Sequence, residues 1–299
     1  KTVFSPQMAD ALCVSSGTAA IKVALKALGV GKGDHVITQA FNFIATVEAI
    51  VDTGASVIFT DVDDTLNMNP KSLERLITKK TKAIIPVHML GVPADMISIN
   101  RVSKKNKIPV IEDACEAIGA KVARKFVGGL SEFGVFSFDF GKMITTGEGG
   151  ALFSKRKSDG KNARMYHDHG HKNIPNLPRG LDRAGLIGFN YRMTEISGAF
   201  GKVQLQKFPR ILKESRKRYR TLERYIRHNE IKFRDINSGN EPNYDTFVIS
   251  IENKKIRDRV IGVLNKTGFG TKNLPDAFNW HCAYFWGHID KKIRNKEVT

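Results

Sequence analysis

Lys142 stands in the stretch of this sequence that is best suited to covalent chemistry. It lies in SFDFGKMITTGEGG, directly after an apolar run that predicts a buried strand. An isolated lysine is usually solvated, and a position in a surface loop is the plain alternative. Here the glycines that follow permit close approach of the backbone. An amine held in this way can have a lowered pKa and can form an imine with a carbonyl group.

Asp113 ends another apolar run, IPVIED, which predicts a second buried strand. Ligands collect at the carboxyl edge of an open parallel sheet, and a carboxylate buried there costs free energy unless it has a cationic partner. Two interpretations stay open from the residues alone. Asp113 could be the N-cap of a helix over residues 114–117. It could instead pair with a pyridinium nitrogen and keep it protonated, so that the ring acts as an electron sink.

The run Ser15-Ser16-Gly17-Thr18 lies where a strand is predicted to end and a helix to begin. Exposed N–H groups at a helix N-terminus, beside small hydroxyl side chains, suit a phosphate group. Ordinary N-capping explains the same residues. A phosphate turn, a strand-end aspartate and a lysine 29 residues further on together follow the order typical of enzymes that use pyridoxal phosphate (PLP).

The elements that must position these residues alternate between short strands and helices. Runs rich in β-formers predict strands over residues 11–15, 35–38, 56–60, 83–87, 109–112, 135–138 and 151–154. Helical periodicity predicts helices over residues 18–28, 44–51, 70–77 and 96–105. Such alternation predicts an α/β fold with a mostly parallel sheet covered on both faces.

The second half of the chain reads differently. Residues 162–191 contain His, Gly and Pro and predict a long loop, which in a compact domain is usually functional or disordered. Helices are predicted over residues 194–206 and 211–227, then a strand over 246–251 and a helix over 256–266. We therefore expect a large domain over residues 1–207. Residues 208–299 would form a linker helix and a smaller α+β domain.

Composition and charge narrow the function classes. The 299 residues are 41% hydrophobic, enough for a full core, yet no apolar run approaches the 18 residues of a membrane span. Three scattered cysteines outside CxxC pairs argue against a disulfide framework or a zinc site, so we expect a cytoplasmic protein without a metal. Residues 1–154 hold 17 basic and 15 acidic side chains, and residues 155–299 hold 31 and 15. A solvated basic surface, an anionic substrate and nucleic acid all suit that excess.

The chain closely resembles the DegT/DnrJ/EryC1/StrS aminotransferases over most of residues 10–230. The resemblance is carried by VSSGTAAIKVALKALGVGKGDHVIT, TKAIIPVHMLGVPADM, VIEDACEAIGA, FSFDFGKMITTGEGGALF and GFNYRMTEISGAFGKVQL, which occur in the family's order and spacing. It implies an aspartate-aminotransferase-like fold (PLP fold type I) and a homodimer with active sites at the subunit interface. It also implies further segments before residue 1 and after residue 299.

The resemblance assigns roles to individual residues. It makes Lys142 the Schiff-base lysine and proton shuttle, and it pairs Asp113 with the pyridine nitrogen. Glu116 falls where many relatives have a Gln near the cofactor's ring oxygen. His88 lies in a motif near the cofactor and has no assigned chemical role.

Further cofactor contacts follow from the same resemblance. Gly17, Thr18 and Ser137 match the residues that bind the phosphate group. Phe43 matches the aromatic residue that stacks on the cofactor ring, with core packing as its alternative. Asn190, in GFNYRM, matches a residue that in the family reaches the phosphate of the neighbouring subunit. The chain's own strand order does not obviously bring this segment to residues 16–18.

The function implied is transfer of an amino group from an amino-acid donor, glutamate by family analogy, to a keto sugar. The sugar would be nucleotide-linked or acidic, in the biosynthesis of cell-surface polysaccharide, lipopolysaccharide or secondary metabolites. GHKNIPNLPRGLDRAGLIGFNYRM and TKNLPDAFNWH look similar to the branch that aminates C8 of a 3-deoxy-octulosonate. The sequence names neither the sugar, the carbon nor the stereochemistry.

Three alternatives compete with this function. The 3-dehydratase branch of the family uses pyridoxamine phosphate and has His in place of the lysine, so Lys142 argues against it. A nucleic-acid-binding regulator would suit the basic second half, but no helix-turn-helix, zinc-finger or RNA-recognition motif supports specific nucleic-acid binding. The third alternative is an inactive chain that keeps only the fold.

Overall fold

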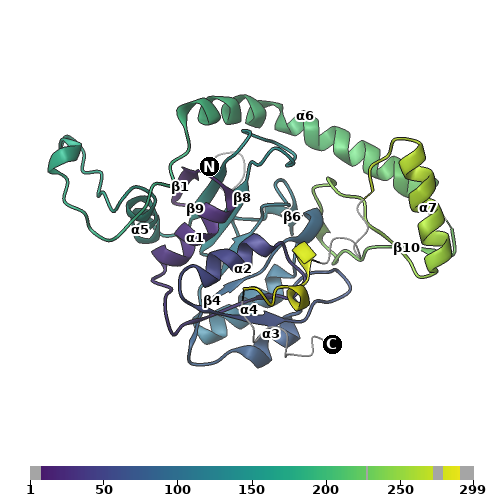
Figure 1. Ribbon diagram of the computed structural model, residues 1–299, viewed down its shortest axis with the longest axis horizontal. Helices are drawn as coiled ribbons and strands as arrows, with labels where there is room; N and C mark the ends of the chain where they lie inside the picture. Colours follow the sequence, from purple (N-terminus) through teal and green to yellow (C-terminus); the bar gives the residue numbers. More distant parts are fainter. Residues whose placement is uncertain (1–7, 227, 272–278, 290–299) are drawn as a thin grey trace.

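The computed structural model describes residues 8–226, 228–271 and 279–289. A mixed sheet forms the centre of its large part (Figure 1). The strands are β1 (Asp10–Val14), β2 (His35–Gln39), β3 (Ser56–Thr60), β4 (Thr81–Ile85), β5 (Ile111–Asp113), β8 (Phe133–Ser137) and β9 (Gly150–Ser154). The groups β1-β9-β8-β5 and β3-β2-β4 are joined by parallel bridges from Ile84 to Val110 and from Val87 to Asp113. Strand β9 runs antiparallel to β1 and β8, and the pairings of β5 with β8 and of β2 with β3 and β4 are parallel.

Helices cover both faces of this sheet, as the alternating pattern predicts. Successive strand residues point to opposite faces, and Val36 and Ile37 accordingly belong to different apolar clusters. The cluster of Val36 includes residues of α1 (Gly17–Ala27), α2 (Ile44–Val51) and α5 (Lys157–His167). The cluster of Ile37 includes residues of α3 (Pro70–Leu76), α4 (Met96–Asn106) and α6 (Glu195–Tyr225). The α/β fold class is confirmed, and the candidate residue Asp113 lies at the carboxyl edge of the sheet.

Helix α5 corrects one prediction from the sequence. Residues 162–167 are helical, although the pattern there predicts the start of a loop. Ala163 and Tyr166 pack in the same apolar cluster as α1, and this tertiary burial outweighs the weak local pattern. The remaining segment contains a single 3₁₀ turn, Arg179–Leu181, between α5 and α6.

Helix α6 corrects a second prediction from the sequence. It runs unbroken for 31 residues across Pro209, where two helices are predicted. A proline removes one backbone hydrogen bond and normally kinks or ends a helix. Here Phe208 is buried in the cluster on that face of the sheet, and Ile211 and Leu212 pack beside it, so contacts on both sides of the proline hold the helix together. The predicted boundary between residues 207 and 208 lies inside this helix.

The C-terminal part is small. Strand β10 (Ile231–Phe233) pairs with β12 (Ile249–Ile251), shorter than the predicted strand over 246–251, and α7 (Lys254–Lys266) follows. Strand β11 (Asn240–Glu241) joins β6 (Lys121–Val122) and β7 (Lys125–Phe126) in a ribbon that ties this part to the large one. Residues 279–289, which include the 3₁₀ turn Ala283–Phe285, return to the large part, where Trp286 is fully buried.

Figure 1 shows α6 running along one side of the molecule, from the sheet to β10 and α7. Among the described residues, no helix is both long enough and apolar enough for a transmembrane segment.

Candidate active site

Asp113 ends β5 at the carboxyl edge of the sheet, with 3% of its surface exposed. Its Oδ2 accepts a hydrogen bond of 2.7 Å from the Thr46 hydroxyl, and its Oδ1 accepts one of 3.1 Å from the N–H of Cys115. Residues 114–117 form turns and no helix, so the helix N-cap interpretation is wrong. The carboxylate is buried, oriented from two sides and suited to hold a cationic partner.

Lys142 lies beside Glu116, with Nζ 3.8 Å from Oε1, and about a quarter of its side chain is exposed. The predicted lowering of its pKa is wrong. Burial alone would lower the pKa, but the acidic groups of Glu116, Cys115, Asp113 and Asp139 outweigh burial and raise it above the ordinary value. The structure thus brings the lysine, the strand-end aspartate and Glu116 together.

The start of α1 lies against the end of β8. A Cβ placed on Gly17 would be 2.9 Å from Cβ of Ser137 and 3.0 Å from Sγ of Cys115, so a side chain at residue 17 would collide. Ser16 is the N-cap, and its hydroxyl accepts a hydrogen bond of 3.0 Å from the N–H of Ala19. The capping interpretation therefore holds for Ser16. Thr18 is exposed, and with Gly17 it forms the first turn of α1 facing Ser137.

Phe43 precedes α2 as its N-cap residue, and Thr46, in the first turn of that helix, bonds to Asp113. The Phe43 ring is 44% exposed, with its centroid 5.7 Å from that of His281. Such exposure does not fit complete core packing, and stacking on a cofactor ring stays a prediction.

Asn190 lies on an exposed segment, paired in an isolated bridge with Asp168. The fold brings this segment to the start of the phosphate turn of its own chain, which the strand order alone does not predict. Val14 pairs with Arg192, and the N–H of Ser15 donates a 2.8 Å hydrogen bond to the carbonyl of Tyr191. Two guanidinium groups, those of Arg179 and Arg192, share the Asp168 carboxylate.

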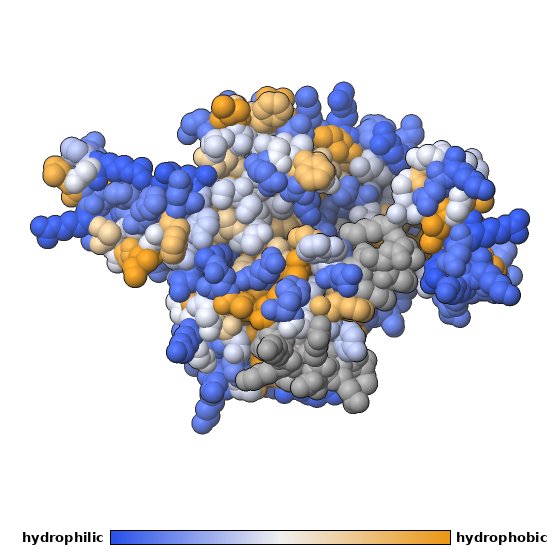
Figure 2. Space-filling model, viewed as in Figure 1, coloured by the Kyte–Doolittle hydropathy of each residue, from blue (hydrophilic) through white to orange (hydrophobic). Residues whose placement is uncertain are grey.

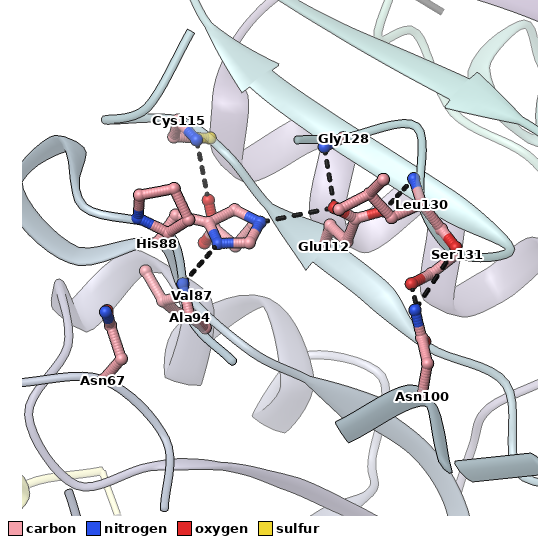
Figure 3. A network of polar contacts seen from close by, with 12 residues as sticks. Asn67, Val87, His88, Ala94, Asn100, Glu112, Cys115, Gly128, Leu130 and Ser131 are labelled. Atoms are coloured by element: carbon pink, nitrogen blue, oxygen red, sulfur yellow. Dashed lines mark hydrogen bonds and ion pairs between the residues drawn. The ribbon is translucent and has the colours of Figure 1, made fainter. Parts of the chain in front are cut away.

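His88 and Glu112 form a fully buried pair beneath the site (Figure 3). The N–H of Ala94 donates to Nδ1 of His88 at 3.0 Å, so the imidazole proton lies on Nε2, which faces Glu112 Oε2 at 3.4 Å. The Glu112 carboxylate also accepts hydrogen bonds of 2.8 and 2.6 Å from the N–H groups of Gly128 and Leu130. This satisfied network fixes the strand end that carries Asp113.

Several residues at the site are missed by sequence reasoning. Thr46 and Gln39 are buried and hold loops around Asp113 and the end of β4, and Gln39 accepts from the N–H groups of Met68 and Val87, each at 3.1 Å. Asn243, Asp245 and Arg234 come from the C-terminal part, more than 90 residues beyond Lys142. No local pattern predicts the contacts of Asn243, Asp245 and Arg234, whereas Gln39, a polar residue that ends the apolar run HVIT, was a usable signal.

The profile of the DegT/DnrJ/EryC1/StrS aminotransferase family matches residues 6–285. The chain belongs to this family. GDP-perosamine synthase of Escherichia coli O157:H7 is 40% identical over 205 residues, which are 66% of this chain and 53% of that protein. A pleiotropic regulatory protein of Geobacillus stearothermophilus is 38% identical over 71% of this chain and 55% of its own length. The chain spans about half the length of the curated relatives it matches.

Among solved structures, an aminotransferase from Psychrobacter cryohalolentis superposes with a TM-score of 0.86 at 28% identity, over 97% of this chain and 78% of that one. The likeness confirms the fold-type-I architecture. The family's cofactor is PLP, and the described residues fit it. Gly17 keeps a side chain away from the start of α1, Asp113 is a buried carboxylate, and Lys142 supplies an amine whose charge interacts with that carboxylate.

Proposed function

We propose that this chain is a PLP-dependent aminotransferase that moves an amino group from glutamate or a similar amino acid to a keto sugar. The observation that carries the proposal is the meeting of Asp113, Lys142 and the start of α1 at one edge of the sheet. Membership of the family and the 40% identity to a GDP-perosamine synthase support a sugar as acceptor. Lys142, in place of a histidine, favours amino transfer over dehydration.

Each residue has a part in the reaction. When bound, PLP supplies an electron sink that stabilises a carbanion next to the amino group. The Asp113 carboxylate would stabilise the positive charge on the ring nitrogen. The amine of Lys142 would hold the cofactor and, when free, would take up and return a proton at its Nζ. Gly17, Thr18 and Ser137 would hold the phosphate group.

The assembly that fits these features is a homodimer with shared active sites. Figure 2 shows apolar atoms on the outer side of α6 over the sheet, where Ile196 and Phe200 are 78% and 61% exposed. Phe140, two residues before Lys142, is 82% exposed. Apolar exposure on this scale is typical of interaction surfaces. Asn190, exposed on the segment beside β1, would then reach the phosphate of a second copy.

A cytoplasmic location agrees with the cysteines. Cys13, Cys115 and Cys282 are all free thiols, as is usual in a reducing compartment. The acceptor is taken to be an anionic sugar, nucleotide-linked or acidic, because the second half of the chain is strongly basic. The octulosonate branch is a narrower version of the same proposal, and of its TKNLPDAFNWH stretch residues 272–278 lie outside the described part of the chain.

Borohydride reduction tests the cofactor site. With PLP bound, reduction should attach the cofactor to Lys142, as located by peptide mass spectrometry. Lys142→Ala should lose the label, the visible absorption band and at least about 10³-fold of the amino-transfer rate, within the range for general acid–base residues. Lys125→Ala, an exposed lysine on β7, is the matched control. A label on another lysine of active wild-type protein would overturn the assignment.

Complementation tests the shared site. Lys142→Ala and Asn190→Ala should each be inactive. After subunit exchange, a mixture should regain up to about a quarter of wild-type activity, since half the dimers are mixed and each mixed dimer has one intact site. Exchange without recovery, or a PLP-saturated monomer in sedimentation, would refute shared sites.

A further inference from the structure

The peptide group between Met89 and Leu90 is held at both ends by charged side chains. Its carbonyl oxygen accepts a 2.7 Å hydrogen bond from the guanidinium of Arg234, and its N–H donates one of 2.9 Å to Oε2 of Glu116. The second carboxylate oxygen, Oε1, lies 3.8 Å from Nζ of Lys142. A continuous chain of polar contacts therefore runs from Arg234 through one peptide group to the amine. Donation to a carbonyl polarises its peptide group, which makes the N–H a stronger donor.

The turn that contains this peptide group has a conformation that its surroundings must impose. Leu90 has φ of 51°, in the left-handed region that a leucine adopts only at a cost. The N–H of Asn243 donates a 3.0 Å hydrogen bond to the carbonyl of Gly91. A Cβ on Gly91 would lie 2.0 Å from Oδ1 of Asn243. The C-terminal part thus presses on the turn Met89–Gly91 and holds it in place.

Arg234 contacts a second loop as well. Its Nε donates to the carbonyl of Thr65 at 2.8 Å, and a second guanidinium nitrogen contacts the same oxygen. Its hydrogen-bond acceptors among the described residues are therefore backbone carbonyls from two loops of the large part. Burial lowers the pKa of Arg234 to about 10, against the opposing effect of Glu116, Tyr219 and Asp63, so the side chain is still charged at neutral pH.

We propose that Arg234 is a positioning residue, which acts on the Lys142 amine through Glu116. The guanidinium locks the Met89–Leu90 peptide group, and that peptide group orients the Glu116 carboxylate toward Nζ. The C-terminal part, which provides Arg234, is in this way coupled to the reactive lysine without touching it. The proposal rests on the proposed role of Lys142 as the reactive amine.

Other titratable groups also act on Lys142 and on Arg234. The acidic groups that act on Lys142 besides Glu116 are those of Asp113, Cys115, Asp139 and Asp245. Those of Asp63 and Tyr219 act on Arg234. The substitutions below leave all six in place, so a change in the lysine reports the Arg234–Glu116 contact chain.

The test measures the rate at which a trace of an amine-reactive acylating reagent labels Lys142 in the cofactor-free protein. Mass spectrometry of the Lys142 peptide gives this rate at a series of pH values. A change in accessibility multiplies the rate at every pH, whereas a change in the pKa of Lys142 shifts the midpoint of the curve. Glu116→Gln keeps the shape and removes the charge, so the midpoint should fall by at least about one pKa unit. An unchanged midpoint in E116Q would overturn the proposal.

Arg234→Met gives a test by sign. If Arg234 acted only as a nearby cation, its removal would raise the midpoint of Lys142, because a like charge is lost. If it positions Glu116, the midpoint should fall toward the E116Q value, and the E116Q/R234M double variant should match E116Q alone. Lys232→Met removes a cation from β10, two residues away, that pairs with Glu252 at the surface. This control should leave the midpoint unchanged.

Arg234→Lys decides the matter if R234M does not fold, as judged by circular dichroism. Its ammonium keeps the charge but cannot reproduce the guanidinium fork to two loops, so a smaller fall in the same direction is expected, and an unchanged or higher midpoint would refute the proposal. Labelling requires no amino transfer. If the midpoints shift as expected but the protein has no transferase activity, only the proposed function is contradicted. If the enzyme is active but the midpoints do not change, only the role of Arg234 is contradicted.

Discussion

The large part and the C-terminal part of this chain are held together by different forces. The sheet and its helices bury apolar side chains from nearly every element, including Phe133, Ile84 and Ile85, none of which is exposed. Among residues 228–271, the buried ones are Pro242 and Asn243, and α7 buries none. Figure 2 shows hydrophilic atoms over much of the region around α7. The large part is thus stabilised by apolar burial. The C-terminal part is placed by polar contacts, such as those of Asn243 and Arg234, and by a small aromatic cluster in which Tyr244 and Phe247 pack against Tyr219 of α6.

That difference matters for the site. Asp113, Ser137 and Gly17 lie at the ends of elements anchored in the core, so their positions follow from the fold. Glu116 also depends on a turn held by the C-terminal part. The candidate site residues Asp113, Ser137 and Gly17 are thus placed by the apolar core, whereas the proposed adjustment of the Lys142 amine comes from the part with few buried side chains.

The largest expected effect separates the two regions by stability. Phe133→Ala should lower the free energy of unfolding by about 3–5 kcal/mol, because it leaves a cavity in a close-packed core. Val263→Ala in α7, 55% exposed, should change it by less than about 0.5 kcal/mol. Urea unfolding of both variants measures the contrast. Similar losses would show that the C-terminal part has a core of its own.

Asp113→Asn should show that chemistry depends on the rigid region without loss of fold. The change keeps the shape but removes the charge that, in the proposed function, holds the ring nitrogen protonated. The rate of each half-reaction should fall at least about 100-fold, or roughly 3 kcal/mol in the barrier, while PLP still binds. Stopped-flow spectroscopy with glutamate measures it. A near-normal rate would reduce Asp113 to a residue that shapes the turn.

Gly17→Ala tests how tightly the core defines the phosphate turn. The new methyl group would meet Ser137 at 2.9 Å, and overpacking of this kind should cost about 1–3 kcal/mol of stability. PLP affinity should weaken in equilibrium titration. Gly198→Ala in α6, where nothing lies within 4 Å, is the control, and it should be neutral or slightly stabilising. Equal behaviour of the two variants would argue against a close-fitted cradle.

The smallest effect concerns the basic second half. If the cations of residues 213–226 are a solvated helix face of an enzyme, DNA should bind weakly, without sequence preference, and binding should decline steeply with salt. Fluorescence anisotropy with two unrelated duplexes at several salt concentrations measures this. Tight binding to one DNA sequence at physiological salt would show that the basic second half of the chain has a nucleic-acid-binding function of its own.

Local pattern was enough where short runs of β-formers mark the sheet strands and helical periodicity marks the helices between them. The strand Ser56–Thr60 and the helix Ile44–Val51 have the predicted bounds, and the other six sheet strands are within two residues of theirs. It failed where distant contacts decide. Pro209 would have ended an isolated helix, but Phe208 is buried against the sheet and the helix continues.

The sequence by itself determined the α/β class and the family, and it singled out Lys142, Asp113 and Gly17 as the candidate site residues, because each lies in a short motif whose residue types carry the information. Tertiary structure alone decided what surrounds them. It placed Arg192 beside Val14 and raised rather than lowered the pKa of Lys142. It also brought Arg234 to the turn Met89–Gly91, which contacts Glu116. Electrostatic effects depend on distances between groups far apart in the chain, and only the folded backbone sets those distances.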